Sequence, residues 1–243
     1  METQNVEIWA LRTLRRGFLY LLVGIIIYVI AEMYVIAEGA GYLFSEYHFD
    51  ALIEPAGIMD AWIVYGLLTL VYLVISLYAI FAMIRPGMRQ LSEVDNRFRI
   101  CYTGTTFLLM GLVMYVPGFI VLFAVFAAAG FSPEATWGTA LVGLTLIWWV
   151  LFIGFIIGLI GGILTFVVGA FKLHSRYQNS LYMAAGILYV IDILLYVIDI
   201  LLMFLGFGVI GGILSAVGDI LMYIALGDTI NKLSTATTTP AQA

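Results

Sequence analysis

Six long runs of apolar residues constrain this chain more than any other feature of its sequence. Each run has about 18 or more residues, the length that an α-helix needs to cross about 30 Å of hydrocarbon. The runs lie at 17–37, 61–84, 101–129, 138–171, 181–205 and 209–226. Apolar residues make up 64% of the chain and charged residues only 10%, as expected for a protein surrounded by lipid. The sequence therefore predicts an all-α integral membrane bundle of six transmembrane helices.

The positions of Lys and Arg support this number of helices, because basic residues are retained on the cytoplasmic side of membrane spans. All 10 of them lie before the first run, between the second and third, between the fourth and fifth, or after the sixth. The other three connections contain none. Dividing the long fourth run into two helices would place Lys172 and Arg176 on the wrong side. The pattern predicts that both termini are cytoplasmic.

The less apolar ends of the chain are expected to lie outside the bundle. We predict a cytoplasmic or interfacial segment at 1–16, a single transmembrane domain at 17–228 and a flexible tail at 229–243. The arginine-rich connection after the second run suits anionic lipid headgroups better than nucleic acid. Membrane lipids are therefore expected partners, and nucleic acid is not.

Three glycines of the fourth run are spaced four residues apart, at Gly154, Gly158 and Gly162. Small residues at this spacing allow the backbones of two membrane helices to approach closely. They predict a helix-packing face, which lies either inside the bundle or between two copies of the chain.

The fifth run repeats one seven-residue sequence, Tyr-Val-Ile-Asp-Ile-Leu-Leu, without a change at 189–202. Seven residues make nearly two helical turns, so Asp192 and Asp199 lie on one helix face. Tyr189 and Tyr196 lie on the same face and alternate with the two acids. An alternative is that a short duplication lengthened the helix and left Asp199 as a copy without a role.

The sixth run carries a matching polar stripe, and a short turn at 206–208 makes the last two helices antiparallel neighbours. Asp192 and Asp219 are expected at similar depths, near the middle of the bilayer. Glu32 adds a fourth acid from the first run. We call the whole set the polar seam: Asp192, Asp199, Asp219, Tyr189, Tyr196, Tyr223, Ser215 and Glu32.

The six runs contain no Lys, Arg or His that could neutralise these acids. An ionised carboxylate at the centre of a membrane helix costs about 2.5 to 3.5 kcal/mol on insertion scales. Three arrangements relieve this cost. The acids can be protonated and hydrogen-bonded to tyrosine hydroxyls, they can line a wet cavity that admits a proton or metal cation, or they can face a donor-bearing helix of another chain.

Three classes of function follow. The first is a non-enzymatic membrane protein, a subunit or packing partner whose polar seam engages another chain or a second copy. The alternative is a small proton- or cation-coupled transporter or channel with Asp192 and Asp219 as carrier sites.

The third class is an intramembrane aspartyl protease, because residues 216–219 resemble a Gly-x-Gly-Asp motif. Ala216 replaces the first glycine of that motif, and the fifth run has no Tyr-Asp dipeptide. We therefore expect no enzymatic activity.

No cofactor or metal is predicted. His48 and His174 are expected on opposite sides of the membrane, which excludes a bis-histidine haem within one chain. The single cysteine, Cys101, cannot form a thiolate metal cage alone.

Three short segments resemble a known family. They lie at 11–17 (LRTLRRG), at 171–181 (FKL and RYQNSL) and at 224–227 (IALG). In these segments the chain is similar to the archaeal membrane-protein family called domain of unknown function 973. The resemblance implies an archaeal plasma membrane. It implies no activity and no functional residues.

Overall fold

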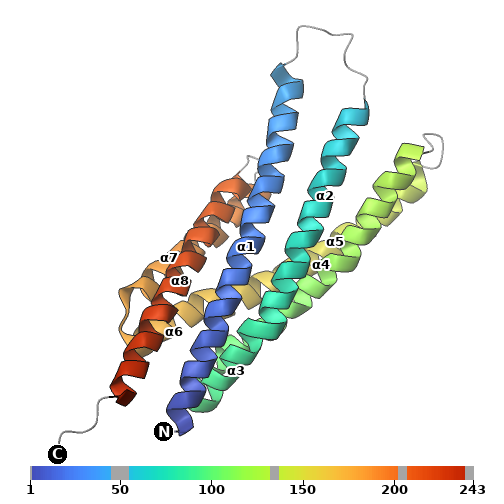
Figure 1. Ribbon diagram of the computed structural model, residues 1–243. Helices are drawn as coiled ribbons and strands as arrows, with labels where there is room; N and C mark the ends of the chain where they lie inside the picture. The colour runs from blue at the N-terminus through green and yellow to red at the C-terminus, as the bar shows by residue number, and fades with distance from the viewer. Residues whose placement is uncertain (1, 45–54, 132–136, 202–206, 239–243) are drawn as a thin grey trace, which may run out of the picture.

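Long helices in antiparallel pairs build the whole of the described structure (Figure 1). The computed structural model describes residues 2–44, 55–131, 137–201 and 207–238, and no strand occurs within these ranges. The pairs are α1 with α2, α4 with α5, and α7 with α8. The elements are α1 (Glu2–Phe44), α2 (Pro55–Tyr78), η2 (Ala79–Ile84), α3 (Arg85–Val94), η3 (Asn96–Phe98), α4 (Arg99–Phe131), α5 (Trp137–Gly162), η4 (Ile163–Val167), α6 (Val168–Tyr177), α7 (Ser180–Leu201) and α8 (Phe207–Thr238).

Six helices within the described ranges are long and apolar enough to cross a membrane, which confirms the predicted all-α fold with six helices of spanning length. α1 begins and α8 ends at the same end of the bundle (Figure 1), as an even number of crossings requires. Two short π-helical segments, η2 and η4, continue α2 into α3 and α5 into α6 without a break.

Several helices extend well beyond the predicted spans. α1 has 43 residues, so at about 1.5 Å per residue it is about 65 Å long, roughly twice the thickness of the hydrocarbon layer. Residues 2–16, predicted to form a separate segment, are the first turns of α1. Residues 229–238, predicted to be a flexible tail, continue α8, in which Thr229 and Ile230 are buried. Counting apolar runs missed these turns because each is apolar on only one side.

The most densely buried part of the bundle lies at the end where α1 begins. Leu11, Leu14 and Phe18 of α1 belong to one buried core with Met88 and Leu91 of α3. Amphipathic turns outside the apolar runs therefore pack against one another.

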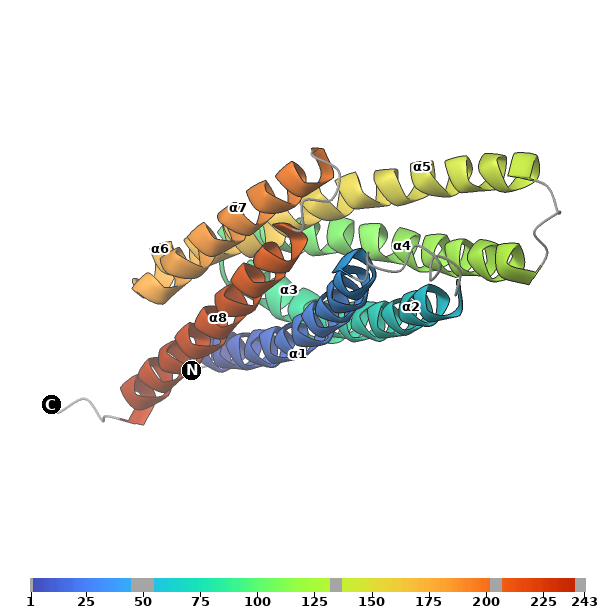
Figure 2. The same ribbon diagram turned by 90° about the horizontal axis from the view of Figure 1, so that it is seen from above.

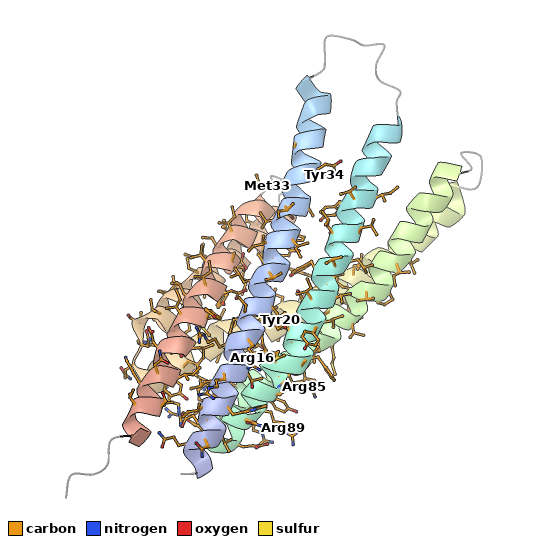
Figure 3. The ribbon with its side chains drawn as sticks, in the orientation of Figure 1. Arg16, Tyr20, Met33, Tyr34, Arg85 and Arg89 are labelled. Carbon is orange, nitrogen blue, oxygen red and sulfur yellow. The ribbon has the colours of Figure 1, made fainter. Side chains whose placement is uncertain are left out.

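Several arginines lie in this same half of the molecule. Arg16, Arg85 and Arg89 lie nearer the end that carries the termini, whereas Met33 and Tyr34 lie towards the opposite end (Figure 3). The position of these arginines agrees with the sequence pattern, in which Lys and Arg occur only near the two ends of the chain and in alternate connections between the apolar runs.

A cluster of charged residues connects several helices at the same end of the bundle. The Arg176 guanidinium of α6 lies 2.8 Å from a carboxylate oxygen of Glu7 and 2.7 Å from one of Asp95. The Tyr177 hydroxyl donates a hydrogen bond of 2.5 Å to Glu7. Side-chain hydrogen bonds from Arg97 are the main cause that lowers the pKa of Asp95 from 3.8 to about 2, and Arg176 adds to the effect. The cluster links α1 and α6 to the connection between α3 and η3.

Close backbone contact joins α4 to α5, which lie side by side in both views (Figure 2). A Cβ atom placed on Gly111 would lie 2.6 Å from the backbone nitrogen of Gly158 and 2.7 Å from the carbonyl oxygen of Gly154. A Cβ on Gly161 would lie only 2.2 Å from the backbone nitrogen of Leu108. Two of the three predicted packing glycines therefore contact a helix of the same chain. Gly162 makes no such close backbone approach, since the nearest atom to a Cβ there would be a side-chain atom of Leu108, 4.0 Å away.

Candidate functional site: an aromatic and acidic cavity inside the bundle

One cavity of about 460 Å³ lies among the six spans, and residues of α1, α2, α4, α5, α7 and α8 all line it. The π-helical segments contribute Ile80 and Phe166. Aromatic side chains dominate the polar part of the wall. Six tyrosines line the cavity: Tyr28, Tyr65, Tyr72, Tyr115, Tyr189 and Tyr196.

Asp219 is the most deeply buried acid of this wall, with 2% of its surface exposed. The hydroxyl of Tyr189 on α7 donates a hydrogen bond of 2.6 Å to Oδ1 of Asp219 on α8. The other oxygen, Oδ2, is buried and has no hydrogen-bond partner among the described residues. Gly218 makes this pair possible, because a Cβ at that position would lie 2.8 Å from the Tyr189 ring. The wall therefore includes an acid with one buried oxygen that no described residue satisfies.

Asp192 lies on the same wall and is paired differently. It receives a hydrogen bond of 2.5 Å from the hydroxyl of Ser215 on α8. The two pairs confirm that α7 and α8 are antiparallel neighbours that bring the polar residues of both helices together. The expected tyrosine partner is found for Asp219, whereas the partner of Asp192 is a serine.

Glu32 is paired within α1. The hydroxyl of Tyr28, one turn earlier, donates a hydrogen bond to Oε1 of Glu32. The Tyr28 ring packs against the Tyr72 ring of α2, with 5.1 Å between ring centroids. Tyr28 thus joins the fourth acid of the polar seam to the cavity wall.

The remaining members of the polar seam have different surroundings. Tyr196 lines the cavity and packs on Phe155, with 5.5 Å between ring centroids. Tyr223 instead contacts Arg15, whose guanidinium lies 4.2 Å from the ring centroid. Sequence reasoning missed this contact, because Arg15 precedes the first apolar run and was placed outside the bundle. Asp199 belongs to α7, but its side chain lies outside what the structure describes.

Acidic groups determine the charge of the cavity. No Lys, Arg or His is found among the described residues that line it, and within the described ranges no ion pair reaches Asp192 or Asp219. Nor does the described part of the chain hold a group of three or more His, Cys, Asp or Glu side chains placed to bind a metal ion. The wall can therefore attract a cation, but it lacks the cluster of charged ligands typical of a divalent-metal site.

Aromatic packing borders the cavity towards the end that carries the termini. The Phe166 ring lies 5.6 Å from the Tyr189 ring and 6.1 Å from the Phe18 ring, measured between centroids. Beyond them, Tyr182 is fully buried, and its hydroxyl lies 2.9 Å from that of Thr229. The acids therefore lie next to the most densely packed part of the bundle, on its side away from the termini.

Comparison with known proteins connects the chain to one family. The family described as Protein of unknown function (DUF973) matches residues 7–243. The chain belongs to this family. Comparisons with curated proteins and with solved structures found no match. The resemblance noted in the three short segments of this DUF973 member is therefore confirmed.

Proposed function

We propose that this DUF973 protein is a non-enzymatic transporter or channel of the plasma membrane that carries a proton or another cation through its central cavity. Asp219 is the main carrier site and Asp192 the second, and both termini face the cytoplasm. The supporting observation is the buried Asp219 carboxyl, whose Oδ2 atom has no partner among the described residues and which lines a cavity of about 460 Å³. Intramembrane acids in this position are typical of ion pathways.

The competing hypothesis is a polar seam that engages another chain. The exposed fractions of its central residues favour transport, because Asp219 and Tyr189 are 2% and 4% exposed. A partner helix could reach them only if α7 and α8 separated from the bundle. Asp192 and Asp219 are also hydrogen-bonded to different hydroxyls, which gives no support to an aspartyl-protease dyad sharing one proton.

Flux through vesicles tests the proposal. Purified protein is reconstituted into liposomes loaded with a pH-sensitive dye, and proton entry is driven by a potassium gradient with valinomycin. We expect Asp219→Asn to reduce flux on the order of tenfold or more, since the substituted amide cannot carry a proton. Asp228→Asn is the matched control, because Asp228 lies on the same helix but is exposed and outside the cavity wall.

Two results would contradict transport. One is equal flux, measured for protons and for radiolabelled monovalent cations in turn, through the Asp219→Asn, Asp228→Asn and unsubstituted proteins. The other is a companion chain that copurifies in constant ratio under mild detergent and is lost in Asp192→Asn, which would restore the hypothesis of a subunit.

A further inference from the structure

The cavity is larger than a proton pathway requires. Its volume of about 460 Å³ lies within the range of small-molecule sites and greatly exceeds the roughly 30 Å³ that one water molecule occupies. A chain of a few waters would conduct protons past Asp219 without a space of this size. The volume points to a ligand with several non-hydrogen atoms.

Aromatic rings line the cavity on several sides. The six tyrosines come from α1, α2, α4 and α7, so their rings approach a central ligand from different helices. Ring faces attract cations, most strongly where water is excluded, and aromatic cages of this kind recognise quaternary ammonium groups. A small metal ion prefers hard oxygen ligands and keeps its hydration shell in such surroundings.

The charge of the cavity wall favours a cationic ligand. Asp219 lines the cavity and has one buried oxygen without a partner among the described residues, and the described lining residues include no basic side chain that would compete for it. A ligand carrying one positive charge and an apolar body satisfies both the acid and the rings.

We propose that the cavity binds an organic ammonium ion, with Asp219 as its counter-charge and the tyrosine rings as its cage. This inference rests on the proposed function, because it names the class of cation that the protein would carry. It is tested with the full-length protein in detergent, by measuring binding of radiolabelled choline and its displacement by tetramethylammonium. The uncharged analogue 3,3-dimethylbutan-1-ol, which has the same shape as choline, serves as the ligand control.

Substitutions at Tyr196 distinguish the contribution of its ring to binding from that of its hydroxyl. Tyr196→Phe keeps the ring and should leave choline binding within about twofold, whereas Tyr196→Leu should weaken it about 5- to 30-fold. Tyr20→Leu is the control for loss of a ring elsewhere, because Tyr20 on α1 is exposed to a similar extent (41%, against 37% for Tyr196) but does not line the cavity. Asp219→Asn should weaken binding at least about tenfold. Gel filtration shows whether each variant is folded.

The outcomes separate this inference from the function on which it rests. Choline binding that depends on the Tyr196 ring and is not inhibited by the neutral analogue supports it. Equal binding of choline and the neutral analogue overturns it, as does equal binding by the Phe and Leu variants. Absence of choline binding together with proton flux that requires Asp219 overturns the inference alone. Absence of both binding and flux overturns the proposed function as well.

Discussion

Adding one methyl group to Gly161 should destabilise the bundle, whereas the same change at the next residue should not. A Cβ on Gly161 would lie 2.2 Å from the nitrogen and 2.7 Å from the Cα of Leu108, and 2.8 Å from the carbonyl carbon of Phe107. These are backbone atoms of α4, so no side-chain rotation relieves the overlap. The two helices would have to separate locally by about 1 Å to reach ordinary contact distances.

The expected magnitude follows from two opposing contributions. Overpacking typically costs about 1 to 3 kcal/mol, and here it lies at the upper end because the overlap is with backbone. Replacing glycine by alanine within a helix returns up to about 1 kcal/mol. We expect Gly161→Ala to lower the free energy of unfolding by about 2 kcal/mol. Gly162→Ala should raise it by up to about 1 kcal/mol, because the nearest atom to its Cβ would be 4.0 Å away.

Unfolding in mixed micelles with increasing mole fractions of SDS measures this difference. Loss of helical packing is followed by tryptophan fluorescence and circular dichroism at a fixed total detergent concentration. The two variants should differ by about 3 kcal/mol, roughly 100-fold in the folding equilibrium. Equal stabilities, or a larger loss for Gly162→Ala, would refute the close contact between α4 and α5.

Two further predictions concern polar contacts. The pKa of Asp95 is lowered to about 2, so the stability that its ion pairs provide is complete above about pH 4 and is lost as the pH falls towards 2. SDS unfolding measured from pH 5 to pH 2 should therefore show a weaker pH dependence for Asp95→Asn, and unchanged dependence would contradict this origin. Tyr189→Phe removes the hydrogen bond to Asp219 and should cost about 1 to 3 kcal/mol in the same assay. The cost should be smaller in an Asp219→Asn background, and strictly additive losses would show that the two residues do not interact.

The sequence determined the class of architecture because that information is local. A run of apolar residues has to form a helix in lipid, where every backbone polar group needs an internal partner, and the placement of Lys and Arg follows from membrane insertion. Helix geometry alone likewise placed Tyr189 and Asp192 on one side of α7, since residues three apart lie on the same helix face. The antiparallel pairing of α7 with α8 followed from the short turn between them.

Only the tertiary structure decided what the polar seam contacts. A single helix shows which residues share a face, but the partner of that face depends on packing among distant segments. Asp219 is therefore found beside Tyr189 and a cavity to which all six spans contribute. Tyr223 packs against Arg15 of α1. Gly161, rather than Gly162, lies against the backbone of α4. Rotation of each helix about its own axis is fixed by side chains from elsewhere in the chain, and no periodicity in one segment records it.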